Sequence, residues 1–333
     1  MRASISPPQS ARIPIPDLAA AHARPPERRR RDRMPQETFQ CRKAMTETLE
    51  QRLQHAHATG DTLVMGVVNV TPDSFSDGGR FFDPARAVDH ALELAAAGAD
   101  ILDVGGESTR PGAAPVDEAE ELGRVLPVIE GIVAATGVPV SIDTAKPAVM
   151  RRAVAAGAAM INDINGLRIA GVVETVAELG VPVCIMHMLG EPRTMQDNPV
   201  YDSVVDDIRD FLSERVQVCR SAGIDPSRIV LDPGIGFGKT LDHNLELLAR
   251  LDELVAMGFP ILVGLSRKSM LGALTGHKRA ADRVAASVAA HLIAAHKGAA
   301  IIRAHDVAET VDALKVLRAV EGAPRTDRIE QDS

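Results

Sequence analysis

The chain has 333 residues, with 37 Lys and Arg against 45 Asp and Glu, and a net charge of −8 at neutral pH. Nucleic-acid binding draws most of its affinity from basic surface, so this acidic balance argues against a nucleic-acid partner. No apolar stretch reaches the roughly 18 residues that a membrane span needs, and we therefore expect no membrane partner.

Residues 1–44 differ in composition from the rest of the chain. They hold 7 of the 21 prolines and 10 basic residues against 4 acidic ones, without apolar periodicity. Such a segment buries too little apolar surface to offset the entropy of ordering, so we predict a disordered Pro/Arg-rich tail. Two interpretations stay open: a mis-assigned start, with Met34 or Met45 as the initiator, or an arm for interaction or targeting.

Eight short apolar runs follow, and each leads through a polar or Gly-rich turn into an amphipathic segment. They span 63–70, 101–106, 139–144, 160–164, 182–187, 229–234, 260–266 and 301–306. Strict alternation of strands and helices demands parallel pairing with right-handed crossovers. Because no GxGxxG fingerprint follows the first strand, we predict a closed (β/α)8 TIM barrel of the α/β class rather than an open sheet. The single barrel domain is predicted over 45–322, with a flexible C-terminal tail over 323–333.

Three connections between these elements are longer than simple turns. Residues 71–83 and 107–117 have the length and the glycines of lids or binding loops, and both follow strands at the face where such barrels carry their active sites. The third, 188–203, contains the only tyrosine, Tyr201, and is predicted to wrap the rim.

Polar residues end the third, fourth and sixth strands. If Asp143, Asn162 and Asp232 point inward, two carboxylates and an amide converge on a cavity suited to a heterocycle with a urea- or guanidine-like edge. Helix capping is the alternative for each of them alone. Asp103 and Asp163 are assigned to the scaffold, since their sequence neighbours point to alternate sides of a strand.

The eighth strand carries Arg303 and His305, which are two residues apart and so share a face. Both side chains can donate to an anion, and phosphate sites of such barrels form in this region. Asn69 ends the neighbouring first strand and offers the kind of neutral oxygen that a phosphate-bound Mg²⁺ accepts.

Two further segments resemble binding motifs. SRKSMLG (266–272) places Lys268 and Ser269 at a helix start, where a carboxylate finds N–H groups and a positive dipole. DPGIGFGKT (232–240) imitates a phosphate loop, but Pro233 occupies the position of its first glycine. We therefore expect no nucleotide binding there.

Taken in order, eight segments of the chain resemble the dihydropteroate synthase family of pterin-binding TIM barrels. They are MGVVNVTPDSFSDGG (65–79), DVGGESTRPGA (103–113), SIDT (141–144), INDI (161–164), MHM (186–188), DPGIGFGK (232–239), GLSRKSMLG (264–272) and IIRAHD (301–306). The resemblance covers about 45–320. It implies condensation of 6-hydroxymethyl-7,8-dihydropterin pyrophosphate with 4-aminobenzoate to 7,8-dihydropteroate and pyrophosphate in folate synthesis, with sulfonamides competing for the aminobenzoate site.

The resemblance also implies roles for individual residues. Those implied to bind the pterin are Asp143, Asn162, Asp232, Lys268 and Arg303. Those implied to bind the pyrophosphate are Asn69, Arg303, His305 and Thr109, with Mg²⁺ as the cofactor and Asn69 as its ligand. Those implied to form the lid and the aminobenzoate pocket are Phe75, Arg110, Pro111, Phe237 and Ser269. The catalytic residues expected for an SN1-like substitution are Asp143, Lys268, Arg303 and His305.

Two alternatives fit the same barrel: a non-catalytic pterin-binding paralogue and a pterin-dependent methyltransferase. The complete TPDSFSDGG and ESTRPGA loops argue against the methyltransferase, which needs neither an aminobenzoate pocket nor a pyrophosphate lid. The family implies a homodimer, for which the Ala-rich helices 282–298 and 307–320 offer an interface. Three cysteines without CxxC or zinc spacing favour a cytoplasmic location.

Overall fold

The computed structural model describes residues 47–71, 83–108, 115–190 and 194–323. All of these belong to one compact unit, 47–333. The tails predicted over 1–44 and over most of 323–333 lie outside the described residues. None of the helices in the described ranges is long and apolar enough to cross a membrane.

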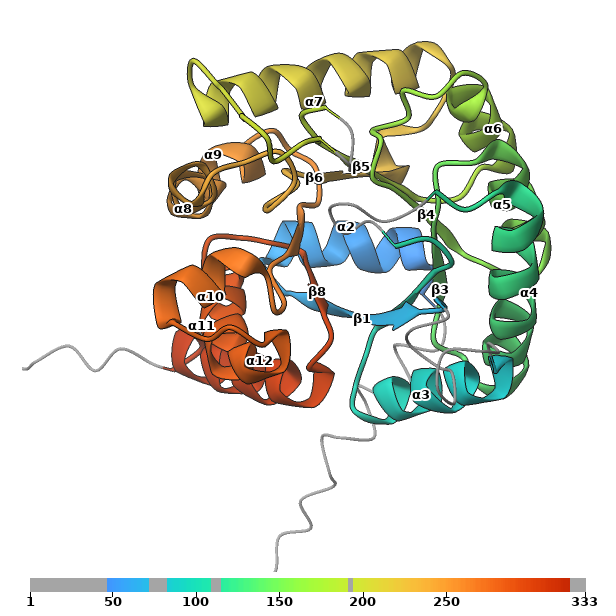
Figure 1. Cartoon of the computed structure of the whole chain (residues 1–333), viewed down its shortest axis with the longest axis horizontal. Helices are drawn as coiled ribbons and strands as arrows, with labels where there is room; N and C mark the ends of the chain where they lie inside the picture. Colours follow the sequence, from blue (N-terminus) through green and yellow to red (C-terminus); the bar gives the residue numbers. More distant parts are fainter. Residues whose placement is uncertain (1–46, 72–82, 109–114, 191–193, 324–333) are drawn as a thin grey trace, which may run out of the picture. The chain divides into compact units, whose positions relative to one another are not determined.

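The eight predicted strands are all present and form a parallel barrel (Figure 1). They are β1 (Leu63–Asn69), β2 (Ile101–Gly105), β3 (Val140–Asp143), β4 (Met160–Asp163), β5 (Val183–Met186), β6 (Ile229–Asp232), β7 (Leu262–Gly264) and β8 (Ile301–Ala304). The hydrogen-bonded order is β6-β5-β4-β3-β2-β1-β8-β7. β6 and β7 then meet through a bridge between Leu231 and Ile261, so the barrel is nearly closed as predicted.

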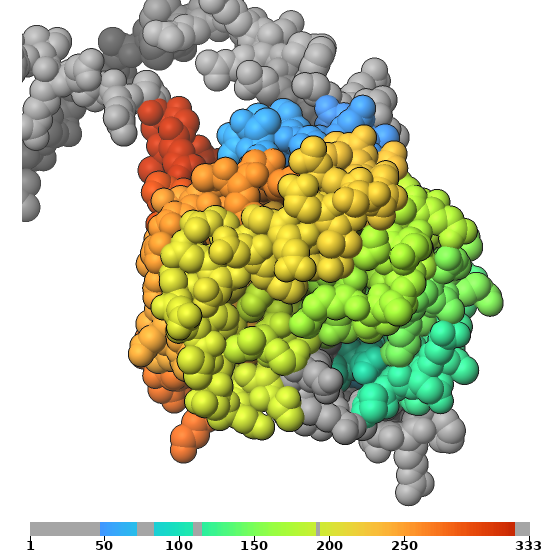
Figure 2. Space-filling model, turned by 90° about the horizontal axis from the view of Figure 1, so that it is seen from above, coloured from blue at the N-terminus to red at the C-terminus, as the bar shows by residue number. Residues whose placement is uncertain are grey.

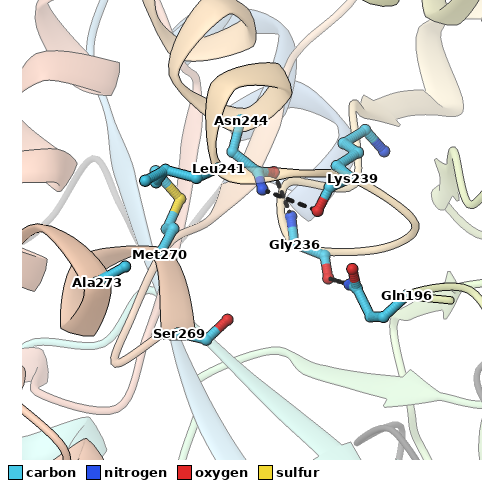
Figure 3. Close-up of a pocket in the computed structure, with 8 residues that line it drawn as sticks. All are labelled: Gln196, Gly236, Lys239, Leu241, Asn244, Ser269, Met270 and Ala273. Atoms are coloured by element: carbon cyan, nitrogen blue, oxygen red, sulfur yellow. Dashed lines mark hydrogen bonds between the residues drawn. The ribbon is translucent and has the colours of Figure 1, made fainter. Parts of the chain in front are cut away.

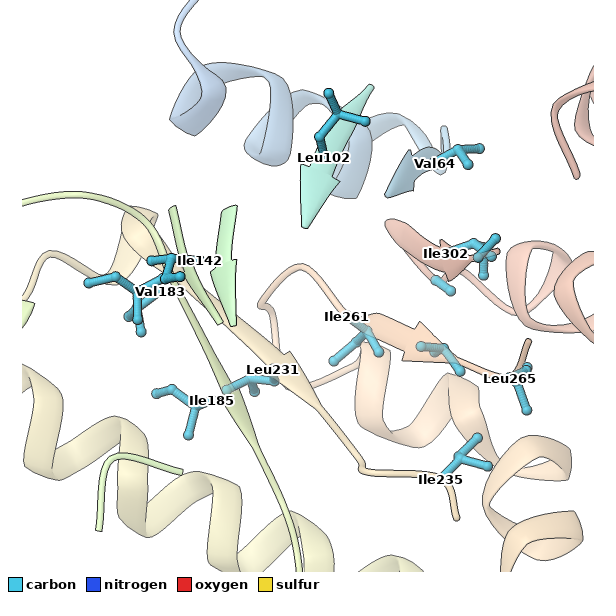
Figure 4. Close-up of a cluster of buried hydrophobic side chains, with 14 of the residues drawn as sticks. Val64, Leu102, Ile142, Val183, Ile185, Leu231, Ile235, Ile261, Leu265 and Ile302 are labelled. Carbon is cyan, nitrogen blue, oxygen red and sulfur yellow. The ribbon is translucent and has the colours of Figure 1, made fainter. Parts of the chain in front are cut away.

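Helices surround this sheet on the outside. They are α2 (Leu49–Thr59), α3 (Pro84–Ala96), α4 (Glu118–Ala135), α5 (Pro147–Ala155), α6 (Val172–Leu179), α7 (Val204–Ser221), α8 (Leu241–Ala249), α9 (Leu251–Val255), α10 (Ser269–Thr275), α11 (Val284–His296) and α12 (Val307–Glu321), with 3-10 turns η1 (Pro226–Arg228) and η2 (Ala280–Arg283). Alternate strand residues such as Val64, Leu102, Ile142 and Ile302 face these helices in the main hydrophobic core (Figure 4). The other residues of each strand face inward. The place of a residue in this alternation therefore decides whether its side chain reaches the barrel interior.

The lower half of the barrel interior is apolar. The inward residues there are Met65, Ile101, Met160, Cys184, Val230, Leu262 and Ile301. Leu49, Leu53 and Ala56 of α2 belong to the same cluster, so α2 closes the end of the barrel at which the strands begin. Figure 2 shows α2 in blue at one end of the body. A filled lower half leaves the carboxyl ends of the strands as the place for a site.

α2 has a capped first turn and is joined to this end of the barrel by an ion pair. Its first turn carries a capping box, in which Thr48 and Gln51 satisfy each other's backbone N–H groups. Arg52 then forms an ion pair with Asp100, 2.6 Å apart, just before β2. No helix was predicted here from the sequence.

Candidate active site

A guanidinium and three polar side chains meet inside the upper barrel. Arg303 of β8 donates from Nε to Asp103 Oδ2 at 2.7 Å and from its terminal nitrogen to Asp143 Oδ2 at 3.0 Å. Asn162 of β4 donates to the same Asp103 oxygen at 3.0 Å. Strand register places Asn162 directly beside Asp143. The structure thus brings together three of the predicted pterin residues, Asp143, Asn162 and Arg303.

Asp103, which was assigned to the scaffold, is the central acceptor of this cluster. It lies two residues after inward-facing Ile101, so the period of the strand turns it into the barrel. Its side chain is fully buried, and its Oδ1 has no hydrogen-bond partner among the described residues. Asp163, by contrast, accepts from the backbone N–H groups of Asn165 and Leu167, which makes it a scaffold residue.

Charges in this cluster influence each other strongly because water is excluded. Burial and the neighbouring Asp103 carboxylate raise the pKa of Asp143 to about 7, although Arg303 opposes the change. Burial works against the charge of Arg303, but the carboxylates of Asp103 and Asp143 outweigh it and raise the pKa of this guanidinium. Two acids around one cation make a site that prefers a ligand able to donate hydrogen bonds.

A second group of side chains lies at the end of β6 and in the loop after it. Asp232 accepts from the Gly234 N–H at 2.7 Å. Lys268 donates to the Ile235 carbonyl, and its Nζ lies 4.5 Å from the centre of the Phe237 ring. Burial lowers the pKa of Lys268 to about 8, against the effect of Asp232. Burial likewise raises the pKa of Asp232, against the effect of Lys268. The structure therefore places Asp232, Lys268 and Phe237 in one neighbourhood.

His305 is positioned by a serine at the end of β7. Its backbone N–H donates to Ser266 Oγ at 3.1 Å, and its ring Nδ1 lies 3.0 Å from the same oxygen. Asn69 is half-buried at the end of β1, where it pairs with Gly105 of β2. Both lie at the carboxyl end of the barrel, as predicted from their places on the strands.

Ser269 borders a hollow of about 180 Å³ (Figure 3). The residues that line it are Gln196, Gly236, Lys239, Leu241, Asn244, Ser269, Met270 and Ala273. Leu241 begins α8 and Ser269 begins α10, so the hollow lies between these helices and the loop after β6. A small space with both polar and apolar walls suits part of an organic ligand.

Lys239 shows why DPGIGFGKT is not a phosphate loop. Its Nζ is buried and lies within 3.0 Å of the carbonyls of Gly234 and Phe237 and of His187 Nδ1. Burial lowers the pKa of His187 to about 3, so the ring is neutral and accepts this bond. The amine is used within its own loop. Sequence reasoning missed this role, and the buried position of the lysine is visible only in the fold.

Four predicted lid residues, Phe75, Thr109, Arg110 and Pro111, lie outside the described residues. In the part of the chain that the structure describes, no three His, Cys, Asp or Glu side chains come together as a metal site. Asn69 itself offers one neutral side-chain oxygen at the carboxyl end of the barrel, a kind of ligand that Mg²⁺ accepts beside water and phosphate.

Comparisons with known proteins find matches over most of the chain. Residues 65–305 match the family described as Pterin binding enzyme. Dihydropteroate synthase of Escherichia coli (strain K12) is 50% identical over 278 residues, which are 84% of this chain and 96% of the relative. A structure of Xanthomonas albilineans dihydropteroate synthase with 4-aminobenzoic acid is 56% identical, has a TM-score of 0.75, and is matched over 79% of this chain and 94% of its own.

Two further solved structures contain ligands. Xanthomonas albilineans dihydropteroate synthase in complex with 7,8-dihydropteroate is 53% identical with a TM-score of 0.73, over 79% of this chain and 95% of that one. Yersinia pestis dihydropteroate synthase with a sulfonamide drug complex is 50% identical with a TM-score of 0.75, over the same shares. The chain belongs to the dihydropteroate synthase family of pterin-binding enzymes.

Proposed function

We propose that this chain condenses 6-hydroxymethyl-7,8-dihydropterin pyrophosphate with 4-aminobenzoate, giving 7,8-dihydropteroate and pyrophosphate. The observation that carries the proposal is the buried cluster of Asp103, Asp143, Asn162 and Arg303, which presents carboxylate and amide groups to a flat heterocycle. Relatives named dihydropteroate synthase at about half identity support the same reaction. The substrates are small molecules, and sulfonamides are expected competitors.

The substrates divide between the two parts of the site. The pterin is assigned to Asp143, Asn162, Asp232, Lys268 and Arg303. The aminobenzoate is assigned to Phe237 and Ser269, together with the lid residues Phe75, Arg110 and Pro111. The position of Lys268 supports this division, because its amine lies near the Phe237 ring and also interacts with Asp232.

The reaction replaces one bond at the exocyclic carbon of the pterin. The carbon–oxygen bond breaks and its electron pair leaves with pyrophosphate, after which the aryl amine attacks and its nitrogen loses one proton. Positive charge that develops on the pterin is stabilised by the carboxylates of Asp143 and Asp232. No covalent intermediate with the protein is required, since an aryl amine is already a nucleophile.

Arg303, His305, Asn69 and Thr109 are assigned to the pyrophosphate. Mg²⁺ would be held by Asn69 and phosphate oxygens, and when bound it would neutralise charge on the leaving group. Ser266 orients His305 through the two contacts described above, and we assign the imidazole as a donor to the anion. We expect chelation of Mg²⁺ to abolish turnover and its re-addition to restore it.

The assay that tests the function is pyrophosphate release by the purified protein with the dihydropterin pyrophosphate and Mg²⁺, with and without 4-aminobenzoate. Chromatography follows dihydropteroate in the same samples. Product that appears only with both substrates supports the synthase. Tight pterin binding without product would contradict the synthase function. A non-catalytic pterin-binding paralogue would then be the better interpretation.

We further propose a homodimer and a cytoplasmic location. The support for the dimer is exposed apolar surface on α11 and α12, where Ile293 is 48% and Val320 67% exposed. The support for the location is cysteine usage, since Cys184 and Cys219 are both buried and free.

A further inference from the structure

The loop between β6 and α8 has an unusual set of hydrogen bonds. Six consecutive carbonyls, from Gly234 to Lys239, each accept from a side chain. Lys239 donates to Gly234 and Phe237, Lys268 to Ile235, Gln196 to Gly236, Tyr201 to Gly238, and Asn244 to Lys239. A surface loop usually leaves many of its carbonyls to water. Here the backbone of the 234–239 loop is held at every residue.

Two of these donors come from the connection between β5 and α7. Gln196 Nε2 donates to the Gly236 carbonyl at 2.8 Å (Figure 3), and Tyr201 OH donates to the Gly238 carbonyl at 2.8 Å. The two carbonyls are those of the residues on either side of Phe237. The rim connection 188–203 therefore contacts the loop at the two positions that set the direction of the Phe237 side chain.

The loop needs such external support because its own backbone is permissive. Gly236 and Gly238 have left-handed φ values of 85° and 63°. Glycine reaches many other conformations at low cost. Tyr201 is itself held in place, since its ring packs edge-on against His243 with the centroids 5.0 Å apart. Without Gln196 and Tyr201, the loop would sample positions in which the Phe237 ring leaves its place beside Lys268.

We propose that Gln196 and Tyr201 are positioning residues for the aryl amine substrate. They hold Phe237 in the place where its ring meets the ring of 4-aminobenzoate, and they thereby set the affinity for that substrate rather than for the pterin. This inference rests on the proposed synthase function. The physical gain is preorganisation, because a wall that is already ordered loses less entropy when the ligand binds.

The test uses the variants Gln196→Ala and Tyr201→Phe in the full-length protein. Removing one neutral hydrogen bond of this kind corresponds to about a 2- to 12-fold change in an equilibrium constant. We expect each variant to raise KM for 4-aminobenzoate by about 3- to 10-fold, within that range. We expect KM for the pterin pyrophosphate to stay within about twofold, because the hydrogen bonds of Asp103, Asp143 and Arg303 among the described residues join them to one another and to Asn162, and not to Gln196 or Tyr201.

The chain offers a matched control for the glutamine. Gln54 Nε2 also donates to a backbone carbonyl at 2.8 Å, that of Ser227, at the opposite end of the barrel. Gln54→Ala should leave both KM values unchanged. Tyrosine emission adds a readout that does not depend on activity, since Tyr201 is the only tyrosine in a chain without tryptophan. If the tyrosine emission of Gln196→Ala equals that of the wild type, Tyr201 keeps its environment when Gln196 is removed.

Two results would overturn the proposal. One is an unchanged KM for 4-aminobenzoate in both variants while the wild-type protein is active. The other is a parallel rise of both KM values, which indicates a general loss of structure. A wild-type protein that forms no dihydropteroate is a different failure, that of the proposed function, and the same assay separates the two.

Discussion

Arg303 is bound by two carboxylates, and this pairing determines how the site responds to protons. Asp103 and Asp143 are both buried around the guanidinium, so at least one of them is costly to ionise. The pKa of Asp143 is raised to about 7 by burial and by Asp103. A pterin that donates hydrogen bonds needs this carboxylate ionised.

The pH dependence of Asp143 gives a first prediction. Since an ionised acceptor is required, kcat/KM for the pterin pyrophosphate should fall as the pH decreases below about 7. Asp143→Asn should lower turnover by roughly 10²- to 10³-fold, as expected for the loss of one charge-stabilising group. Initial rates between pH 5.5 and 8.5 check both. A variant within about twofold of the wild type would contradict the role of the carboxylate.

The same pKa shift predicts the pH dependence of stability. Because the folded pKa of Asp143 lies above the usual carboxyl value, folding favours its protonated form. The contribution of the protonated Asp143 carboxyl to the free energy of unfolding is fully present below about pH 4, near the unfolded pKa. It is lost as the pH rises through about 7. Asp143→Asn should therefore gain stability relative to the wild type between pH 5 and 8. Urea unfolding at a series of pH values measures this difference.

Asp103 provides a second prediction at this scale. Asp103→Asn removes the charge that accepts from Arg303 and Asn162 while keeping the shape of the side chain. Breaking a buried pair of this kind costs about 2–5 kcal/mol, and the misplaced guanidinium should lower kcat/KM by about tenfold or more. Thermal melts and steady-state kinetics report the two effects.

Asp163→Asn is the matched control for Asp103. Asp163 is equally buried but faces away from the barrel interior, and among the described residues it accepts from backbone N–H groups alone. This variant should lose stability and retain kcat per folded molecule. Equal losses of activity in both variants would mean that Asp103 acts only through folding.

Among the elements, the loop after β6 has the strictest steric requirement. Gly234 has a left-handed φ of 65°, and a Cβ there would lie 1.9 Å from the His187 carbonyl oxygen. No side-chain movement relieves a clash with backbone. The 234–239 loop therefore requires glycine at its first position.

This requirement yields a third prediction, for Gly234→Ala. The loop must shift, which should move Phe237 and lower kcat/KM for 4-aminobenzoate by more than about tenfold. Gly223→Ala is the control, because Gly223 also has a positive φ of 86° but nothing lies within 4 Å of its Cβ position. Gly223→Ala should lower the free energy of unfolding by only roughly 1–2 kcal/mol, the cost of an alanine in the left-handed conformation. Its activity should be unchanged. Similar kinetics for the two variants would contradict the steric argument.

At the scale of the whole molecule, apolar side chains are exposed on one pair of adjacent helices. Ile293 of α11 is 48% exposed, and Val316 and Val320 of α12 are 64% and 67% exposed. α11 and α12 pack against each other, so these residues belong to one side of the barrel. An interface between two copies would cover them.

A fourth prediction follows for assembly. Sedimentation should show a dimer, and Ile293→Glu should weaken it by about tenfold or more, because a carboxylate would be buried without a partner. Val133→Glu is the control, since Val133 on α4 is 42% exposed but far from these helices in the chain. A monomer at micromolar concentration, or equal effects of both variants, would contradict an α11–α12 interface.

Much of the fold could be predicted from the sequence because it depends on local periodicity. Apolar runs of strand length alternate with helical stripes, and this alone specifies eight parallel strands and the ends at which polar residues gather. The same alternation placed Asp143, Asn162 and Asp232 at strand ends, where an inward direction would bring them together. Asp103 was not included in the predicted site because the sequence alone does not say which face of its strand points inward. The pairing of the strands shows that Ile101 points inward, and Asp103, two residues later, therefore does so too.

Only the tertiary structure decided which of these groups meet. Arg303 lies 200 residues from Asp103 and 160 from Asp143, and no pattern in the sequence links them. The bonds from Gln196 and Tyr201 to the 234–239 loop likewise cross 40 and 37 residues. Local sequence determines strands and helices through short-range sterics and hydrophobic spacing. Pairing between distant side chains depends on barrel register and loop paths, and these are set by packing of the whole chain.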